Sequence, residues 1–161
     1  MQAHKFRSRL EDIRSHVLEL SARERDLQVM RERSVACGAQ YGSIGHGAGA
    51  GDGSGPILRV MQADADLDSM RARVNAEIRQ VLPVLYGHDN RGGLARMKGS
   101  AVADCICAYY LQGMTWPEVA AQFGWPDGGL DSKDGPQLCK RRAYRGIEKV
   151  ELLGAEVVSS W

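Results

Sequence analysis

The chain has 161 residues, enough for one domain or for a small domain with an extended helical arm. Aromatic residues make up 6% of it and charged residues 25%, a balance that favours surface-rich helices over the large compact core of an enzyme. The formal net charge is +1, so the total argues neither for nor against a nucleic-acid partner, and only the local distribution of charge is informative.

The cysteines follow neither a zinc-knuckle nor a redox CxxC spacing: they are Cys37, Cys105, Cys107 and Cys139. We therefore expect them to be reduced and mostly buried, as small apolar side chains. No apolar run approaches the roughly 20 residues that a membrane-spanning helix needs, and no signal peptide is evident at the start. These observations favour a cytoplasmic protein that binds no metal, no cofactor and no membrane.

Residues 5–35 are predicted to form a long helix with a single apolar stripe. The apolar positions are spaced 4, 3, 4, 3 and 7 residues apart, which is a heptad pattern: Phe6, Leu10, Ile13, Val17, Leu20 and Leu27. The missing position of the stripe holds Glu24, and the remaining positions are largely charged residues of mixed sign. Such a stripe must be buried against another helix, in the same chain or in a partner.

Residues 37–56 interrupt this pattern with eight glycines in twenty residues, and we expect a flexible linker there. The segment lacks both the GK[ST] ending and the preceding strand that a phosphate-binding glycine loop requires. The linker separates the first predicted helix from a second one of similar length.

The second helix is predicted from about Leu58 to Leu85. Its apolar residues repeat at near-heptad spacing: Val60, Ala63, Leu67, Met70, Val74, Ile78, Val81 and Leu85. It can fold back on the first helix as an antiparallel, coiled-coil-like hairpin, which we predict to be a domain over residues 1–90. Pro83 is expected to kink or end the helix, before a loop over 86–93. Three aspartates, Asp64, Asp66 and Asp68, alternate by two and so spread around the helix as a solvated face rather than a metal site.

From Leu94 the pattern changes to short helices, predicted to form a domain over 94–161. The stretch 99–112 is apolar on most sides, as expected of a buried supporting helix, and Gly113 supplies its end. A short helix from Thr115 to Phe123 follows. Thr115 is placed as its N-cap, and Glu118, three residues later, completes a capping box.

The final helix is predicted from about Pro136 to Leu153. One face is apolar, with spacings of 4, 3, 4 and 3: Cys139, Ala143, Gly146, Val150 and Leu153. The other faces are basic, since residues 136–150 hold five Lys or Arg residues against Glu148 alone. A one-sided basic helix after a short capped helix is the arrangement that docks into a DNA major groove.

The residues YYLQGMTWPEVAAQFGW (109–125) and CKRRAYRGIEKVELL (139–153) resemble a sigma-70 region-four-like helix-turn-helix. This motif occurs in phage-encoded regulators, the late-gene and terminase-operon transcriptional activators of the RinA and ArpU type and related prophage proteins. The long charged helices of the N-terminal half are similar in architecture only. The resemblance implies an all-α fold, with a long helical hairpin followed by a helix-turn-helix bundle of three helices.

The resemblance also implies a function: a dimeric, sequence-specific transcription regulator that binds double-stranded DNA, with host RNA polymerase as a further potential contact. The helix from Thr115 to Phe123 would lie across the DNA backbone. The final helix would carry the DNA-binding residues, which we take to be Gln137, Lys140, Arg141, Arg142, Tyr144, Arg145 and Lys149. One departure from the family pattern is the long connection over residues 125–135, where a turn of three or four residues is usual.

Two other classes of protein compete with a DNA-binding regulator. An enzyme is disfavoured because none of the histidines lies near a nucleophile motif: His4, His16, His46 and His88. A non-enzymatic coiled-coil protein, such as an anti-repressor or an assembly factor, is supported by the heptads, and its basic helix would meet an acidic protein surface. A small terminase subunit is a third alternative that also binds DNA, and it would assemble into a large ring.

Overall fold

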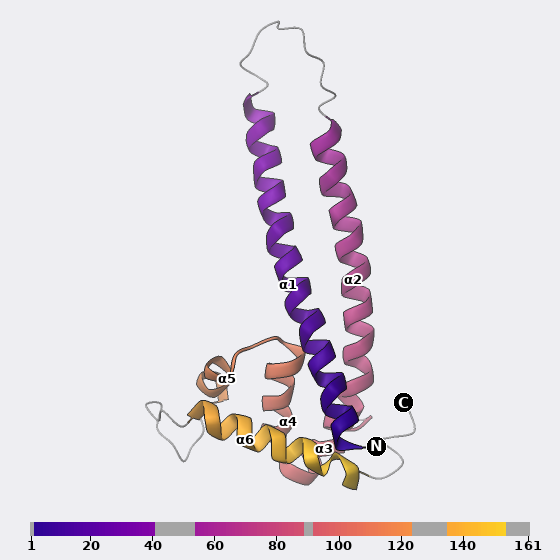
Figure 1. Cartoon of the computed structure of the whole chain (residues 1–161), viewed down its shortest axis with the longest axis vertical. Coiled ribbons are helices and arrows are strands. Elements are labelled where there is room, and N and C mark those ends of the chain that lie inside the picture. Colours follow the sequence, from indigo (N-terminus) through magenta and orange to yellow (C-terminus); the bar gives the residue numbers. More distant parts are fainter. Residues whose placement is uncertain (1, 41–53, 89–91, 124–134, 154–161) are drawn as a thin grey trace, which may run out of the picture. The chain divides into compact units, whose positions relative to one another are not determined.

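The computed structural model describes residues 2–40, 54–88, 92–123 and 135–153, and every regular element in these ranges is a helix (Figure 1). The all-α class predicted from the sequence is therefore confirmed. In chain order the elements are α1 (Ala3–Gln40), α2 (Ser54–Tyr86), α3 (Gly93–Lys98), α4 (Ser100–Ile106), the π-helix η1 (Cys107–Leu111), α5 (Trp116–Phe123), α6 (Gly135–Glu148) and the 3-10 helix η2 (Lys149–Leu152). In the described part of the chain, no helix is long and apolar enough to cross a membrane.

Both long helices extend further than the sequence pattern predicts. Helix α1 passes through Gly38 to Gln40, since a single glycine costs a helix only about 1 kcal/mol. The rest of the predicted linker, residues 41–53, lies outside the described residues. Helix α2 does not end at Pro83 but continues for another turn to Tyr86. The residues around the proline explain this, because Val81, Val84 and Leu85 are fully buried and their packing offsets the lost backbone hydrogen bond.

The chain divides into two compact units, and their boundary differs from the predicted one near residue 90. Unit 1 comprises residues 1–17 and 74–161, and unit 2 comprises residues 18–73. The beginning of α1 and the end of α2 thus pack with the short helices. Each long helix contributes to both units.

Unit 2 is an antiparallel pair of helical segments from α1 and α2. Its core is the heptad stripe, where Leu27, Leu67 and Met70 are buried. Two ion pairs join the helices: Arg31 with Asp64 at 2.5 Å, and Arg71 with Glu24 at 2.8 Å. Glu24, which interrupts the apolar stripe, therefore has a partner on the neighbouring helix. Exposed pairs of this kind contribute only about 0–1 kcal/mol each, so the buried stripe holds the two segments together.

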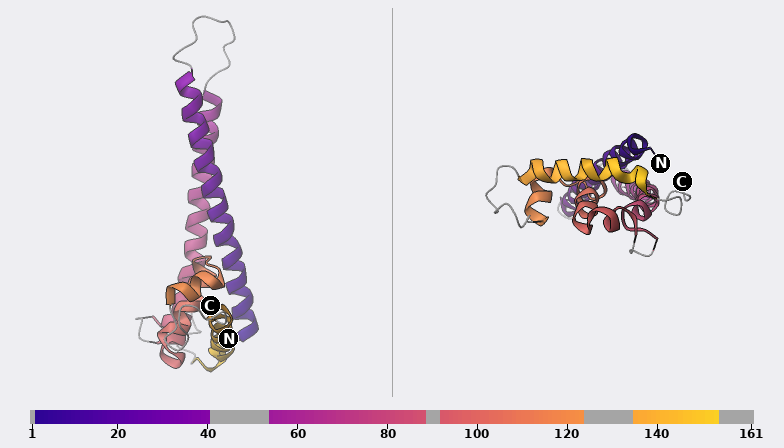
Figure 2. Two further views of the ribbon diagram at one scale, coloured as in Figure 1. Left: turned by 90° about the vertical axis from the view of Figure 1, so that its left-hand side faces the viewer. Right: turned by 90° about the horizontal axis from the view of Figure 1, so that it is seen from below.

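Unit 1 combines the start of α1 and the end of α2 with all the shorter helices. Within it, α6 packs against both α4 and α5, and α3 packs against α4 (Figure 2). Its core takes side chains from both long helices and from the short ones. The largest fully buried side chains are Tyr110, Phe6, Leu10, Ile13, Leu85, Leu94, Ile106, Val74, Val81, Val84, Val119 and Val150.

The C-terminal helices differ in detail from the predicted bundle of three. Helix α3 is additional, and it begins at Gly93 inside the predicted loop. The supporting helix begins at Ser100 and finishes as the π-helix η1, before Gly113 stops it with a φ of +75°. Helix α6 ends at Glu148 rather than Leu153, because its last turn tightens into η2, as helix ends commonly do.

Candidate nucleic-acid interface

Helix α6 is seated on a small apolar core that it shares with α4, η1 and α5. The buried members of this core are Cys105, Ala108, Val119 and Cys139, which are at most 1% exposed. Burial is the main cause that raises the pKa of Cys105 to about 12, and the neighbouring Cys139 is the second. The thiol of Cys105 therefore stays protonated and packs as an apolar group. The expectation of buried cysteines holds for Cys105 and Cys139, whereas Cys107 is half-buried. The side chain of Cys37 lies outside the described residues.

The start of α5 is fixed by Thr115 and Glu118. The Thr115 backbone N–H donates a hydrogen bond to the Glu118 carboxylate at 2.6 Å, and the Thr115 hydroxyl donates to the same oxygen at 2.7 Å. These two bonds, the backbone one first, lower the pKa of Glu118. Because this pKa is lower in the folded state, the stabilisation by the cap is present above the ordinary glutamate pKa and is lost as the pH falls through the lowered value.

Helix α6 approaches α4 closely at Gly146. A Cβ at this position would lie 2.6 Å from Cγ1 of Val102, closer than real Cβ contacts come. Gly146 is buried, as are Ala143, Ile147 and Val150 on the same side of α6. A small residue here lets the helix lie deep in the unit, which leaves its opposite side as the exposed one.

The start of α1 is anchored to the segment before α5 through Arg14. Its guanidinium donates hydrogen bonds to the backbone carbonyls of Tyr109 and Met114, the latter at 2.9 Å. It also lies 3.7 Å from the centroid of the Tyr109 ring, a cation–π contact, and that ring stacks on Trp116 at 3.9 Å. Arg14 therefore ties α1 to the first residue of α5.

Tyr144 extends this set of contacts to α6. Its ring meets Trp116 edge-on at 6.4 Å, and the guanidinium of Arg7 from α1 lies 4.6 Å from its centroid. Lys140 lies beside it, with Nζ 5.8 Å from the ring centroid. Tyr144 and Lys140 are both half-buried. The structure thus places the half-buried Tyr144 in contact with both α1 and α5.

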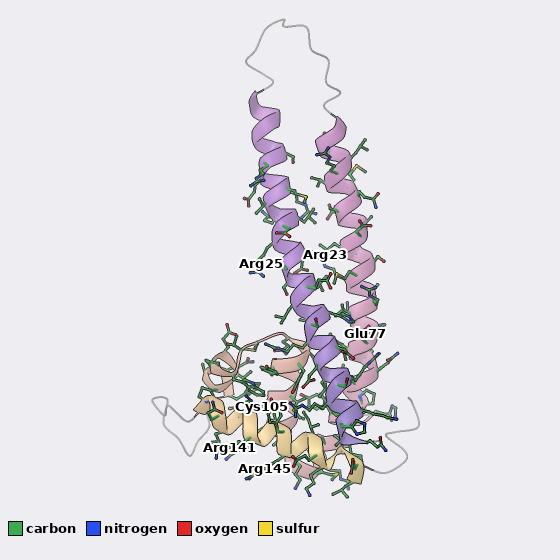
Figure 3. All side chains as sticks on the ribbon, in the orientation of Figure 1. Arg23, Arg25, Glu77, Cys105, Arg141 and Arg145 are labelled. Carbon is green, nitrogen blue, oxygen red and sulfur yellow. The ribbon has the colours of Figure 1, made fainter. Side chains whose placement is uncertain are left out.

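The exposed side of α6 and of η2, which follows it directly, carries a cationic stripe. Gln137, Arg141, Arg145 and Lys149 are exposed and Arg142 is half-buried. Figure 3 shows Arg141 and Arg145 projecting from α6 away from Cys105. Among the described residues, no ion pair or hydrogen bond engages the side chains of Arg141, Arg145 and Lys149.

Sequence reasoning missed the part of the site that comes from α1. Arg7 and Arg14 belong to a heptad helix whose charged positions resemble any solvated face, and no local signal marks them as contacts of Tyr109 and Tyr144. The connection between α5 and α6, residues 124–134, contains most of the long segment noted above and lies outside the described residues. The described residues hold no group of three or more His, Cys, Asp or Glu side chains that could bind a metal ion.

Comparison with known proteins finds no match, whether with a family model, a curated protein or a solved structure.

Proposed function

We propose that the protein binds double-stranded DNA through α6, as a transcription regulator of the phage type that the sequence resembles. The observation that carries the proposal is the cationic stripe of Arg141, Arg145 and Lys149 on α6 and η2, whose other side is buried in unit 1. A helix held in this way presents its basic residues from a fixed backbone, which helps to set the register in which they meet DNA.

The dimensions and charge of α6 support this proposal. Its 14 residues span about 21 Å, and a helix fits the B-DNA major groove, which is about 12 Å wide. Arg141 and Arg145 are four residues apart, a spacing at which like charges destabilise a helix by a few tenths of a kcal/mol. A nearby polyanion converts this repulsion into binding energy.

The test measures affinity for specific and random duplexes across a salt series, with Arg141→Ala and Arg145→Ala. If Arg145 contacts a phosphate, its loss weakens binding to every sequence and flattens the salt slope by about 0.9. If Arg141 reads a guanine, its loss costs about 1–3 kcal/mol on the specific site and little on random DNA.

The matched control is Arg79→Ala, which removes an exposed arginine from α2 in the same unit. It should leave both affinity and salt slope unchanged beyond a small non-specific effect. Equal affinities and slopes for the wild type and both α6 variants would contradict the proposal. The basic side of α6 would then be a solvated face as far as DNA is concerned, and the proposal of a partner protein with an acidic surface would replace that of DNA binding.

A second proposed property is self-association through unit 2. Six large apolar side chains on this unit remain 43–62% exposed: Leu18, Val29, Met30, Ile57, Leu58 and Met61. Two helices bury only one narrow stripe between them, and a second copy would cover more of this surface. A dimer would also match the two-fold symmetry of the operators that helix-turn-helix regulators bind.

Sedimentation equilibrium at micromolar concentration tests self-association. The wild type should dimerise. Met61→Glu should raise the dimer dissociation constant at least about tenfold, because burying a methionine side chain contributes about 1.5–3 kcal/mol and the variant replaces this gain with a charge. Gln62→Glu, at the exposed neighbouring position, adds the same charge and should have little effect. A wild type that stays monomeric, or a large ring, would contradict the dimer.

A further inference from the structure

We infer that a cationic cavity between α3, α4 and α6 binds a phosphate group, and that in the proposed DNA complex this group belongs to the DNA backbone. The cavity has a volume of about 380 Å³ and lies wholly within unit 1. The second half of the inference rests on the proposed function, whereas the first half concerns the cavity alone.

The lining of the cavity has the composition of an anion site. Four cationic side chains surround it, against the single carboxylate of Glu148: Lys98, Arg142, Arg145 and Lys149. The apolar residues Ala101 and Val102 form part of its wall. Arginine and lysine side chains from α3, α6 and η2 line one space, and such donors suit the tetrahedral oxygens of a phosphate, which accepts hydrogen bonds from several directions.

Two features of the backbone create this cavity. Gly146 lines it and carries no side chain, and α6 therefore comes close to Val102, so that the cations beside Gly146 share one space with α3. Lys98 is the last residue of α3, and the chain turns into α4 at Gly99, which has a φ of +92°. Lys98 thus reaches the cavity from a different helix, which a solvated face of α6 alone would not provide.

The position of Arg145 connects the cavity to the proposed DNA interface. Arg145 belongs both to the exposed stripe of α6 and to the lining of the cavity. A DNA strand that follows the stripe therefore passes the cavity. One backbone phosphate held there by Lys98 and Arg145 would fix the register of α6 in the groove without reading sequence.

The test on DNA compares the wild type with Lys98→Gln, across a salt series and on specific and random duplexes. Loss of a charge-assisted contact should weaken binding on the order of tenfold to both duplexes and flatten the salt slope by about 0.9. Ala101→Glu places a carboxylate at an exposed position of the lining, in the first turn of α4 where it suits the helix, and should weaken binding at least as much. Arg79→Gln is the control for simple loss of charge, and it should change neither quantity beyond a small non-specific effect.

A titration with inorganic phosphate, followed by backbone amide NMR, separates the two possible sources of the group. Shifts at residues 98–102 and 142–149 in the wild type, lost in Lys98→Gln, support the phosphate site itself. If these shifts appear and no duplex is bound, the cavity binds free phosphate. The phosphate site then stands, and only the proposed DNA-binding function fails. If duplexes are bound with unchanged affinity and slope in Lys98→Gln and Ala101→Glu, and phosphate causes no shifts, the inference is overturned while the proposed function survives.

Discussion

A fragment of residues 94–161 should fail to fold, although the sequence pattern predicts it as a domain. The core of unit 1 takes essential side chains from outside this fragment, including Phe6, Leu10 and Ile13, which are completely buried. Each deletion of such a side chain costs about 2–5 kcal/mol, and the three losses together are comparable to the 5–15 kcal/mol that typically holds a domain together. Circular dichroism should show no cooperative thermal transition for the fragment.

A matched shortened chain keeps unit 1 whole and removes unit 2, replacing residues 18–73 with about six Gly and Ser residues. Packed helices lie about 8–10 Å apart, a distance that such a linker spans easily. This shortened chain should unfold cooperatively, because both Val17 and Val74 retain their buried places in unit 1. A cooperative transition of the 94–161 fragment, at a temperature similar to that of the shortened chain, would contradict the assignment of α1 and α2 to the core.

Replacing Arg14 with alanine should lower the free energy of unfolding by about 2–4 kcal/mol. The variant loses charge-assisted hydrogen bonds to two backbone carbonyls, together with the cation–π contact to Tyr109. The carbonyl oxygens of Tyr109 and Met114 then lose this donor in a partly buried place. Urea unfolding measured by circular dichroism gives the difference directly, provided that the slope of the transition is unchanged.

Arg25→Ala is the control for Arg14→Ala. Arg25 lies on the same helix in unit 2, is exposed, and makes one hydrogen bond to a carbonyl of its own helix (Figure 3). Its loss should change stability by no more than about 0.5 kcal/mol. Equal effects of the two substitutions would mean that Arg14 does not hold α1 to the rest of unit 1.

Local patterns in the sequence predicted most of the helices. The heptad spacing identified the buried side of the long helices, as Phe6, Leu67 and Val81 illustrate. The Thr115 and Glu118 pair marked the start of α5. These features depend on interactions within one or two helical turns, and a sequence carries such interactions directly.

Local patterns did not predict which elements pack against each buried helix face. Periodicity shows which side of α1 is buried, but not that its first turns pack in unit 1 while its later turns pack with α2 in unit 2. The same limit applies to Tyr144, whose ring contacts Arg7 and Trp116 on two other helices, contacts that the pattern of its own helix does not encode. Lys98 was not singled out because its place in the cavity lining depends on how closely α3 approaches α6, which no local pattern encodes.

The split of unit 1 between the two ends of the sequence also determines when it can form during synthesis. Val17 and the start of α6 at Gly135 are separated by roughly 120 residues, which a ribosome adds in about 6–24 s at 5–20 residues per second. Throughout this time early α1 lacks its neighbours from α6, such as Tyr144 beside Arg7. Unit 2, whose two segments follow each other along the chain, can pair first and bring the end of α2 back to the start of α1. The helical pair would then bring Arg9 to Gln80 and His16 to Glu77, so that the start of α1 has part of its final surroundings before the last helix arrives.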